Sequence, residues 1–129
     1  MAWMRIRLEL ARGPGFPEGS PRHGYEFVLP LLPDGHLDRH AYGATPELCT
    51  VHRFWEGQGD FVGELVQIDG NWAFSYAPGS ADDEPIAHFA QSVFSEGEYV
   101  SIREPTGAEH TFRIVRVEPA PGLARRRPG

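Results

Sequence analysis

The sequence predicts a small all-β domain, in which an antiparallel β-barrel of about seven or eight short strands is favoured over a β-sandwich. Short runs of alternating apolar and polar residues recur along the chain, and turn sequences separate them. Fifteen glycines and twelve prolines interrupt the 129 residues, which leaves room for at most one short helix. Residues 1–118 are predicted to form one domain, because a single domain usually has about 100–200 residues.

The N-terminal part of the chain contains two predicted strands. Residues 3–11 alternate in character. The apolar positions that share one face of this half-buried strand are Met4, Ile6, Leu8 and Leu10. Glycines and prolines crowd residues 12–22, which predicts a long loop. Residues 24–29 then form the second strand, and Pro30 and Pro33 are expected to stop it.

The middle of the chain begins with its least β-like segment. A short helix is predicted near residues 34–42, with Asp34 as its N-cap. The alternative is a turn at Asp34 and Gly35 followed by irregular chain. Strand patterns return at residues 48–55 and 61–68, on the two sides of a glycine-rich turn.

A second hairpin follows at an Asp-Gly turn, residues 69–70. This dipeptide between two strand patterns is a strong hairpin signal. Trp72, Phe74 and Tyr76 alternate along the next strand, so they share one face and are expected to fill the core. Residues 86–93 are an ambiguous strand.

The last hairpin covers residues 98–117, around a turn at residues 104–109. In its second strand Phe112 and Ile114 lie on one face, whereas Val115 and Val117 lie on the other. Such a switch of the apolar face is typical of a bulged or bent strand at a barrel corner. This hairpin is therefore the reason to prefer a barrel to a sandwich.

The entry to this hairpin, residues 94–102, reads Phe-Ser-Glu-Gly-Glu-Tyr-Val-Ser-Ile. It resembles the phrase Phe-x-x-Gly-Gln-Tyr-Val in the flavin-binding barrel of ferredoxin-reductase-type proteins. That family holds its flavin with a later Arg-x-Tyr-Ser/Thr stretch. The nearest counterpart here, residues 110–113, lacks the arginine, the tyrosine and the hydroxyl at those places. The resemblance implies a barrel topology and no flavin site.

Two pairs of residues could bind zinc. His36 and His40 would share one helix face, and Cys49 with His52 would complete a set of four nitrogen and sulfur ligands. The second pair fits less well, because residues three apart on a strand point to opposite faces. The sequence therefore predicts zinc as a candidate cofactor, and surface histidines without a metal as the alternative.

Two further candidate sites have simpler interpretations. Cys49 as a nucleophile would need a base within hydrogen-bond reach, and it is expected instead to be a small buried side chain. Asp82, Asp83 and Glu84 could bind calcium, but they lack the spacing of a calcium-binding loop. We expect them to form an acidic surface loop.

The distribution of charge argues against nucleic-acid binding. The net charge is −6, and all twelve basic residues are arginines. Arg125, Arg126 and Arg127 stand in the predicted disordered tail, residues 119–129, so the rest of the chain carries −9. Nucleic-acid affinity depends mainly on basic surface. A contact between the tail and an anionic partner is the remaining alternative.

The chain is predicted to be a cytoplasmic protein. The N-terminus has no apolar signal region, and no segment has the roughly 20 apolar residues that a membrane helix needs. The lone cysteine excludes an intramolecular disulfide. Edge strands suggest a homodimer, and Trp55 beside Phe54 is a candidate contact for a protein or small-molecule partner.

The leading functional prediction is a small binding or interaction domain without catalytic residues. The first alternative is a metal- or cofactor-dependent small enzyme that uses the histidines and the cysteine of residues 36–52. The second is an anion or nucleic-acid contact through the arginine tail. The sequence names no substrate or partner.

Overall fold

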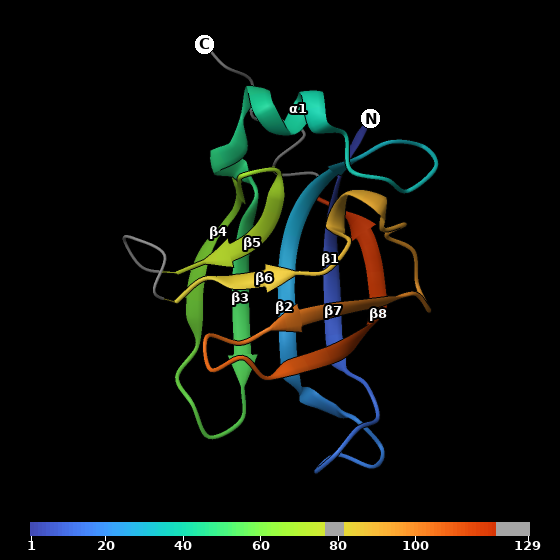
Figure 1. The fold of residues 1–129 in the computed structure, drawn as a ribbon. Coiled ribbons are helices and arrows are strands. Elements are labelled where there is room, and N and C mark those ends of the chain that lie inside the picture. The colour runs from blue at the N-terminus through green and yellow to red at the C-terminus, as the bar shows by residue number, and fades with distance from the viewer. Residues whose placement is uncertain (77–81, 121–129) are drawn as a thin grey trace.

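Eight antiparallel strands close into one barrel in the computed structural model, which describes residues 1–76 and 82–120 (Figure 1). The strands follow one another around the barrel in chain order, and β1 closes it by pairing with both β2 and β8. The predicted barrel is confirmed, and the sandwich alternative is wrong. The strands are β1 (Ala2–Leu10), β2 (Ser20–Leu31), β3 (Thr50–Trp55), β4 (Phe61–Ile68), β5 (Asn71–Ser75), β6 (Glu84–Ile86), β7 (Tyr99–Arg103) and β8 (Glu109–Pro119).

The β1–β8 ladder contains the bulge that the sequence predicts. Leu8 pairs with Ile114 and Ile6 pairs with Val117, so β8 has one more residue than β1 between these two pairs. The extra residue is Val115. Because of it, Val117 returns to the inner face, where it packs against the core. The apparent switch of apolar face in the sequence is the signature of this bulge.

The second strand ends between the two prolines that are expected to stop it, because β2 continues through Pro30 to Leu31. The Pro30 carbonyl accepts a hydrogen bond from the Asp38 N–H at 2.9 Å. The nitrogen of a strand residue lies on the same side of the strand as its carbonyl, so the Pro30 nitrogen also faces away from β1. On that side of β2 the ladder with β3 ends at Phe27. The missing N–H of Pro30 therefore costs no ladder hydrogen bond.

The predicted short helix is present but begins later than expected. It is α1 (Arg39–Ala44), and its N-cap is Asp38, whose carboxylate accepts a hydrogen bond from the Ala41 N–H at 2.9 Å. Asp34 instead accepts from the backbone N–H of His36 at 3.0 Å and stabilises a turn. A single turn of 3-10 helix, η1 (Pro46–Leu48), connects α1 to β3.

The ambiguous segment at residues 86–93 is not a strand beyond Ile86. His88 has a φ of 53°, which is left-handed, and it precedes the 3-10 turn η2 (Phe89–Gln91). This turn places Phe89 in the core. The burial of the Phe89 ring therefore favours a turn here, although the sequence pattern is that of an extended strand.

The barrel extends slightly beyond the predicted domain boundary at residue 118. Pro119 belongs to β8 and pairs with Met4. The N–H of Ala120 donates to the carbonyl of Trp3 at 3.0 Å, and Ala120 is buried. The predicted disordered tail can therefore begin only at residue 121, and residues 121–129 lie outside the described part of the chain.

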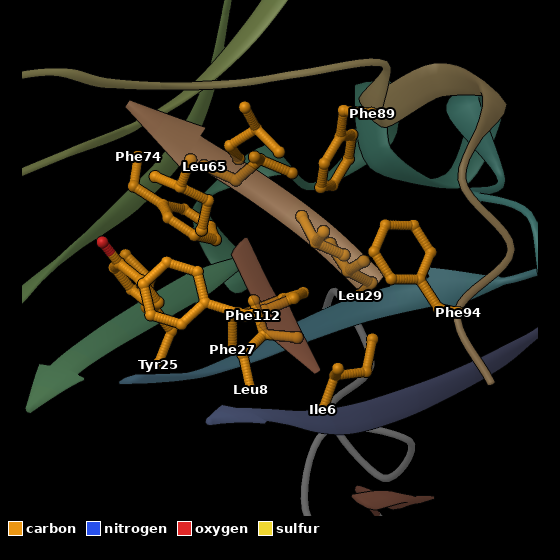
Figure 2. Close-up of a cluster of buried hydrophobic side chains, with 14 of the residues drawn as sticks. Ile6, Leu8, Tyr25, Phe27, Leu29, Leu65, Phe74, Phe89, Phe94 and Phe112 are labelled. Carbon is orange, nitrogen blue, oxygen red and sulfur yellow. The ribbon is translucent and has the colours of Figure 1, made fainter. Parts of the chain in front are cut away.

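Apolar side chains fill the barrel from one end to the other (Figure 2). At the end covered by α1, the rings of Tyr42 and Trp72 meet edge to face with their centroids 4.8 Å apart. At the opposite end Tyr25 packs against Phe74 and Phe112, at 5.3 and 5.1 Å. Figure 2 shows the hydroxyl oxygen of Tyr25 turned away from this apolar cluster. The end of the barrel away from α1 is therefore where polar groups enter.

We predict that Gly24→Ala destabilises the barrel by about 1–3 kcal/mol, because a new methyl group must be accommodated in filled space. A Cβ at this position would overlap the carbonyl oxygen of Leu8 and lie 3.0 Å from the ring of Phe54. The control is Gly43→Ala in α1, where no atom lies within 4 Å. Urea unfolding should show a lower midpoint for the first variant and an unchanged or higher midpoint for the second. Equal midpoints would contradict this account.

Candidate ligand-binding pocket

Arg53 is a charged side chain at an inward position of β3. It alternates with Val51, and both are buried, with exposed fractions of 5% and 1%. Since β3 starts beside η1 and runs away from α1, Arg53 lies at the far end of the barrel (Figure 1). Its guanidinium carbon lies 4.6 Å from the ring centroid of Trp55, so the charge is supported by an aromatic face.

The three nitrogens of the Arg53 guanidinium each face an oxygen of the chain. Nη1 donates to the side-chain oxygen of Gln58 at 3.1 Å. Nε lies 3.3 Å from Glu84 Oε2, and Nη2 lies 3.6 Å from Glu104 Oε1. The buried Nε–H is not aligned for a hydrogen bond with any described residue, so its contact with Glu84 is an ion pair only. Arg53 thereby connects β3 to β6 and to the β7–β8 turn.

Glu84 is buried, with 3% of its surface exposed, and it accepts hydrogen bonds from two tyrosines. Its Oε1 lies 2.6 Å from the hydroxyl of Tyr76 and 3.2 Å from that of Tyr25. Burial raises the pKa of Glu84, while the Tyr76 hydrogen bond and the charge of Arg53 oppose this rise. Burial, and then the charge of Glu84, also raise the pKa of both tyrosines. Both hydroxyls therefore stay protonated and act as donors.

A pocket of about 290 Å³ lies beside this cluster. Its walls come from the β3–β4 turn, from the ends of the β5–β6 connection and from the β7–β8 turn, which lie away from α1 in Figure 1. The pocket combines buried charged groups with exposed aromatic and polar ones, as ligand sites usually do. The lining residues are Arg53, Gln58, Phe61, Tyr76, Asp82, Glu84, Glu104, Pro105 and Thr106.

The four residues of the predicted zinc site lie in different environments. His36 contacts Asp34 at 3.1 Å in the turn before α1, and His40 is exposed on α1. Cys49 is fully buried in the core, whereas His52 lies near the surface with its Nε2 3.1 Å from Asp60. Across the described residues, no three His, Cys, Asp or Glu side chains are grouped to hold one metal ion.

The remaining sequence-predicted site residues have varied positions. Trp55 is half-buried, with the Arg53 guanidinium over its ring, and its role as a contact residue stays a prediction. Of the acidic run, Glu84 is buried, Asp83 is half-buried and Asp82 is exposed on the pocket wall, so the run is not simply a solvated loop. The last candidates, Arg125, Arg126 and Arg127, lie outside the described residues.

A hydroxyl–imidazole contact lies at the start of β2. Ser20 Oγ and His23 Nδ1 are 2.7 Å apart, and burial lowers the pKa of His23. The His23 ring packs against Phe16 and Trp55, with centroids at 4.8 and 4.5 Å. Ser20 Oγ also accepts from the N–H of Arg22 at 3.2 Å. These contacts close a local turn, which gives the pair a structural role.

Comparisons with protein-family models, with curated proteins and with solved structures gave no match to this chain. The resemblance of residues 94–102 to a flavin-binding barrel therefore stays a prediction. Within residues 1–76 and 82–120, no helix has the length and apolar character needed to span a bilayer.

Sequence analysis missed Arg53, Glu104 and the role of Glu84. One signal for Arg53 was present, because Val51, Arg53 and Trp55 alternate and so place a charge on the apolar face of a strand. A buried charge requires a partner. The partner itself, Glu84, comes from a distant strand and could not be identified from spacing.

We predict that Arg53→Met lowers the free energy of unfolding by about 3–5 kcal/mol at about pH 7, because it leaves Glu84 buried without its counter-charge. Loss of the arginine charge raises the pKa of Glu84 further. At pH values between the pKa of Glu84 in the unfolded chain and its higher pKa in the folded protein, Glu84 binds a proton only in the folded protein, which stabilises the fold. The penalty should therefore shrink when urea unfolding is repeated at about pH 5.

The control for this prediction is the double variant Arg53→Met/Glu84→Gln, which has no buried carboxylate at position 84. Its stability relative to the single variant Glu84→Gln should not depend on pH over the same interval. Suppose that Arg53→Met lowers the free energy of unfolding by the same amount at both pH values, and that the double variant shows the same pH dependence as the single variant. Glu84 would then not be the group whose protonation changes the stability.

We also predict that Cys49 does not react with iodoacetamide in the folded protein. Burial raises the pKa of its thiol to about 12, so little thiolate forms at about pH 8, and the side chain is fully buried. Mass spectrometry should show labelling only after urea is added. Equal labelling rates with and without urea would mean that Cys49 is accessible.

Proposed function

We propose that the protein is a non-catalytic barrel that binds a small molecule in the pocket beside Arg53 and Glu84. The observation that carries the proposal is a charged pair buried at the mouth of an open pocket. Perturbed titratable groups next to a cavity are characteristic of functional sites. Two tyrosines fix the carboxylate of the pair, so its geometry is set before any ligand arrives.

Stability alone does not account for this arrangement. A buried ion pair contributes little net stability, and well-packed apolar residues of similar size can replace it at no cost. The same barrel closes its other end with the apolar contact of Tyr42 and Trp72. Ligand binding therefore explains the presence of these buried charges better than a contribution to stability does.

The pocket resembles a binding site more than a catalytic one. Gln58 and the two tyrosines hold the Arg53–Glu84 pair by hydrogen bonds, and the tyrosine hydroxyls remain protonated because their pKa values are raised. The cluster thus holds a fixed set of donors and acceptors around Phe61 and Tyr76. The homodimer, the cytoplasmic location and the contact of the arginine tail with an anionic partner stay predictions from the sequence.

The test is a fragment screen by ¹H–¹⁵N NMR on the full chain. We expect bound fragments to shift the indole signal of Trp55 and the amides of Thr106 and its neighbours. Thr106→Trp, which fills the pocket from the β7–β8 turn, should abolish these shifts. The matched control is Ser95→Trp, at an exposed position near the opposite end of the barrel, and it should leave them unchanged. Absence of shifts in this region, or equal binding to both variants, would overturn the proposal.

A further inference from the structure

We infer that the ligand of this pocket is a small organic cation, an ammonium or guanidinium compound, whose charged group binds Glu104 and Asp82. The inference rests on the proposed function and deepens it. Its first support is the sign of the charge: three acidic side chains and one arginine line the pocket. The whole chain carries −6, so the field around the pocket also attracts cations.

The acidic groups around Arg53 disfavour an anionic ligand there. Arg53 donates from Nη1 to Gln58, and its Nε and Nη2 face Glu84 and Glu104. An anionic ligand at the guanidinium would lie close to the carboxylates of both Glu84 and Glu104. Like charges at such short range repel one another, which weakens the binding of an anion.

Glu104 has capacity for another partner. Its nearest polar neighbours are His110 Nε2 at 3.3 Å, Thr106 Oγ1 at 3.5 Å and Arg53 Nη2 at 3.6 Å. A charge-assisted hydrogen bond from nitrogen to a carboxylate is about 2.7–2.9 Å long. The contacts of Glu104 are all longer, so an ammonium or guanidinium group would make the first close one.

The aromatic wall fits the same ligand class. Phe61 is 45% exposed, and its ring centroid lies 6.0 Å from that of Tyr76. The chain already places a guanidinium near this wall, because the Arg53 Cζ lies 5.8 Å from the centroid of Phe61. A cation over an aromatic face gains electrostatic attraction. The volume of about 290 Å³ limits the ligand to a small molecule.

Four probes of similar size test the inference: n-butylguanidinium, n-butylammonium, butanoate and butan-1-ol. Each is titrated into the full chain at constant ionic strength, and the NMR shifts of Trp55 and Thr106 are followed. We expect the two cations to bind about tenfold more tightly than butanoate, because only the cations can donate a charge-assisted hydrogen bond to Glu104. Tighter binding of butanoate or butan-1-ol would overturn the cation assignment while the proposed function survives. No binding by any probe, together with a negative fragment screen, would overturn both.

A pair of matched variants locates the charge that binds. Glu104→Gln should weaken n-butylguanidinium binding about tenfold and leave butan-1-ol binding unchanged. Glu96→Gln makes the same change in net charge at an exposed position before β7, and it should weaken binding less than about twofold. Equal weakening by the two variants would show that only the overall charge matters and would overturn the role of Glu104.

Discussion

The ion pair between Arg53 and Glu84 holds the barrel where its backbone ladder is thinnest. β6 and β7 share one register pair, Ile86 with Ile102, whereas β7 pairs with β8 along its whole length. Arg53 reaches Glu84 on β6 and Glu104 just after β7, so one side chain from β3 connects both strands from inside. Removal of Arg53 would leave Glu84 buried without a counter-charge. The pair therefore fixes how β3, β6 and the β7–β8 turn meet at the pocket wall, and its carboxylate fixes the hydroxyls of both tyrosines.

The two ends of the barrel are closed by different chemistry. Around α1 the seal is aromatic, made by the rings of Tyr42, Trp72 and Phe89. At the other end the seal is ionic, and the groups around it stand on turns. The buried pair and its tyrosines are on or next to strands, whereas Glu104, Pro105 and Thr106 belong to the β7–β8 turn. Because the turn residues of the pocket wall are not part of the core, their sequence or conformation can change without disturbing the buried pair.

Features that depend on local pattern could be predicted from the sequence. Alternation and turn residues identified the barrel class, the hairpins and the bulge at Val115. Features that depend on distant packing could not: β2 continues through Pro30 because no strand lies on that side, and Phe89 is drawn into the core. The site was missed for the same reason. Arg53 and Glu84 look like ordinary polar residues until the barrel closes and their side chains meet inside it, from the non-adjacent strands β3 and β6.

The ladder between β1 and β8 has a consequence for the order of folding. All the other ladders join strands that follow one another in the chain, so the loops that close them are much shorter than the whole domain. The β1–β8 ladder pairs Met4 with Pro119 and requires the ends of the domain to meet. During synthesis, one edge of β1 therefore waits without a partner until β8 has been made. The outward charges of Arg5, Arg7 and Glu9 protect that waiting edge against pairing with another chain.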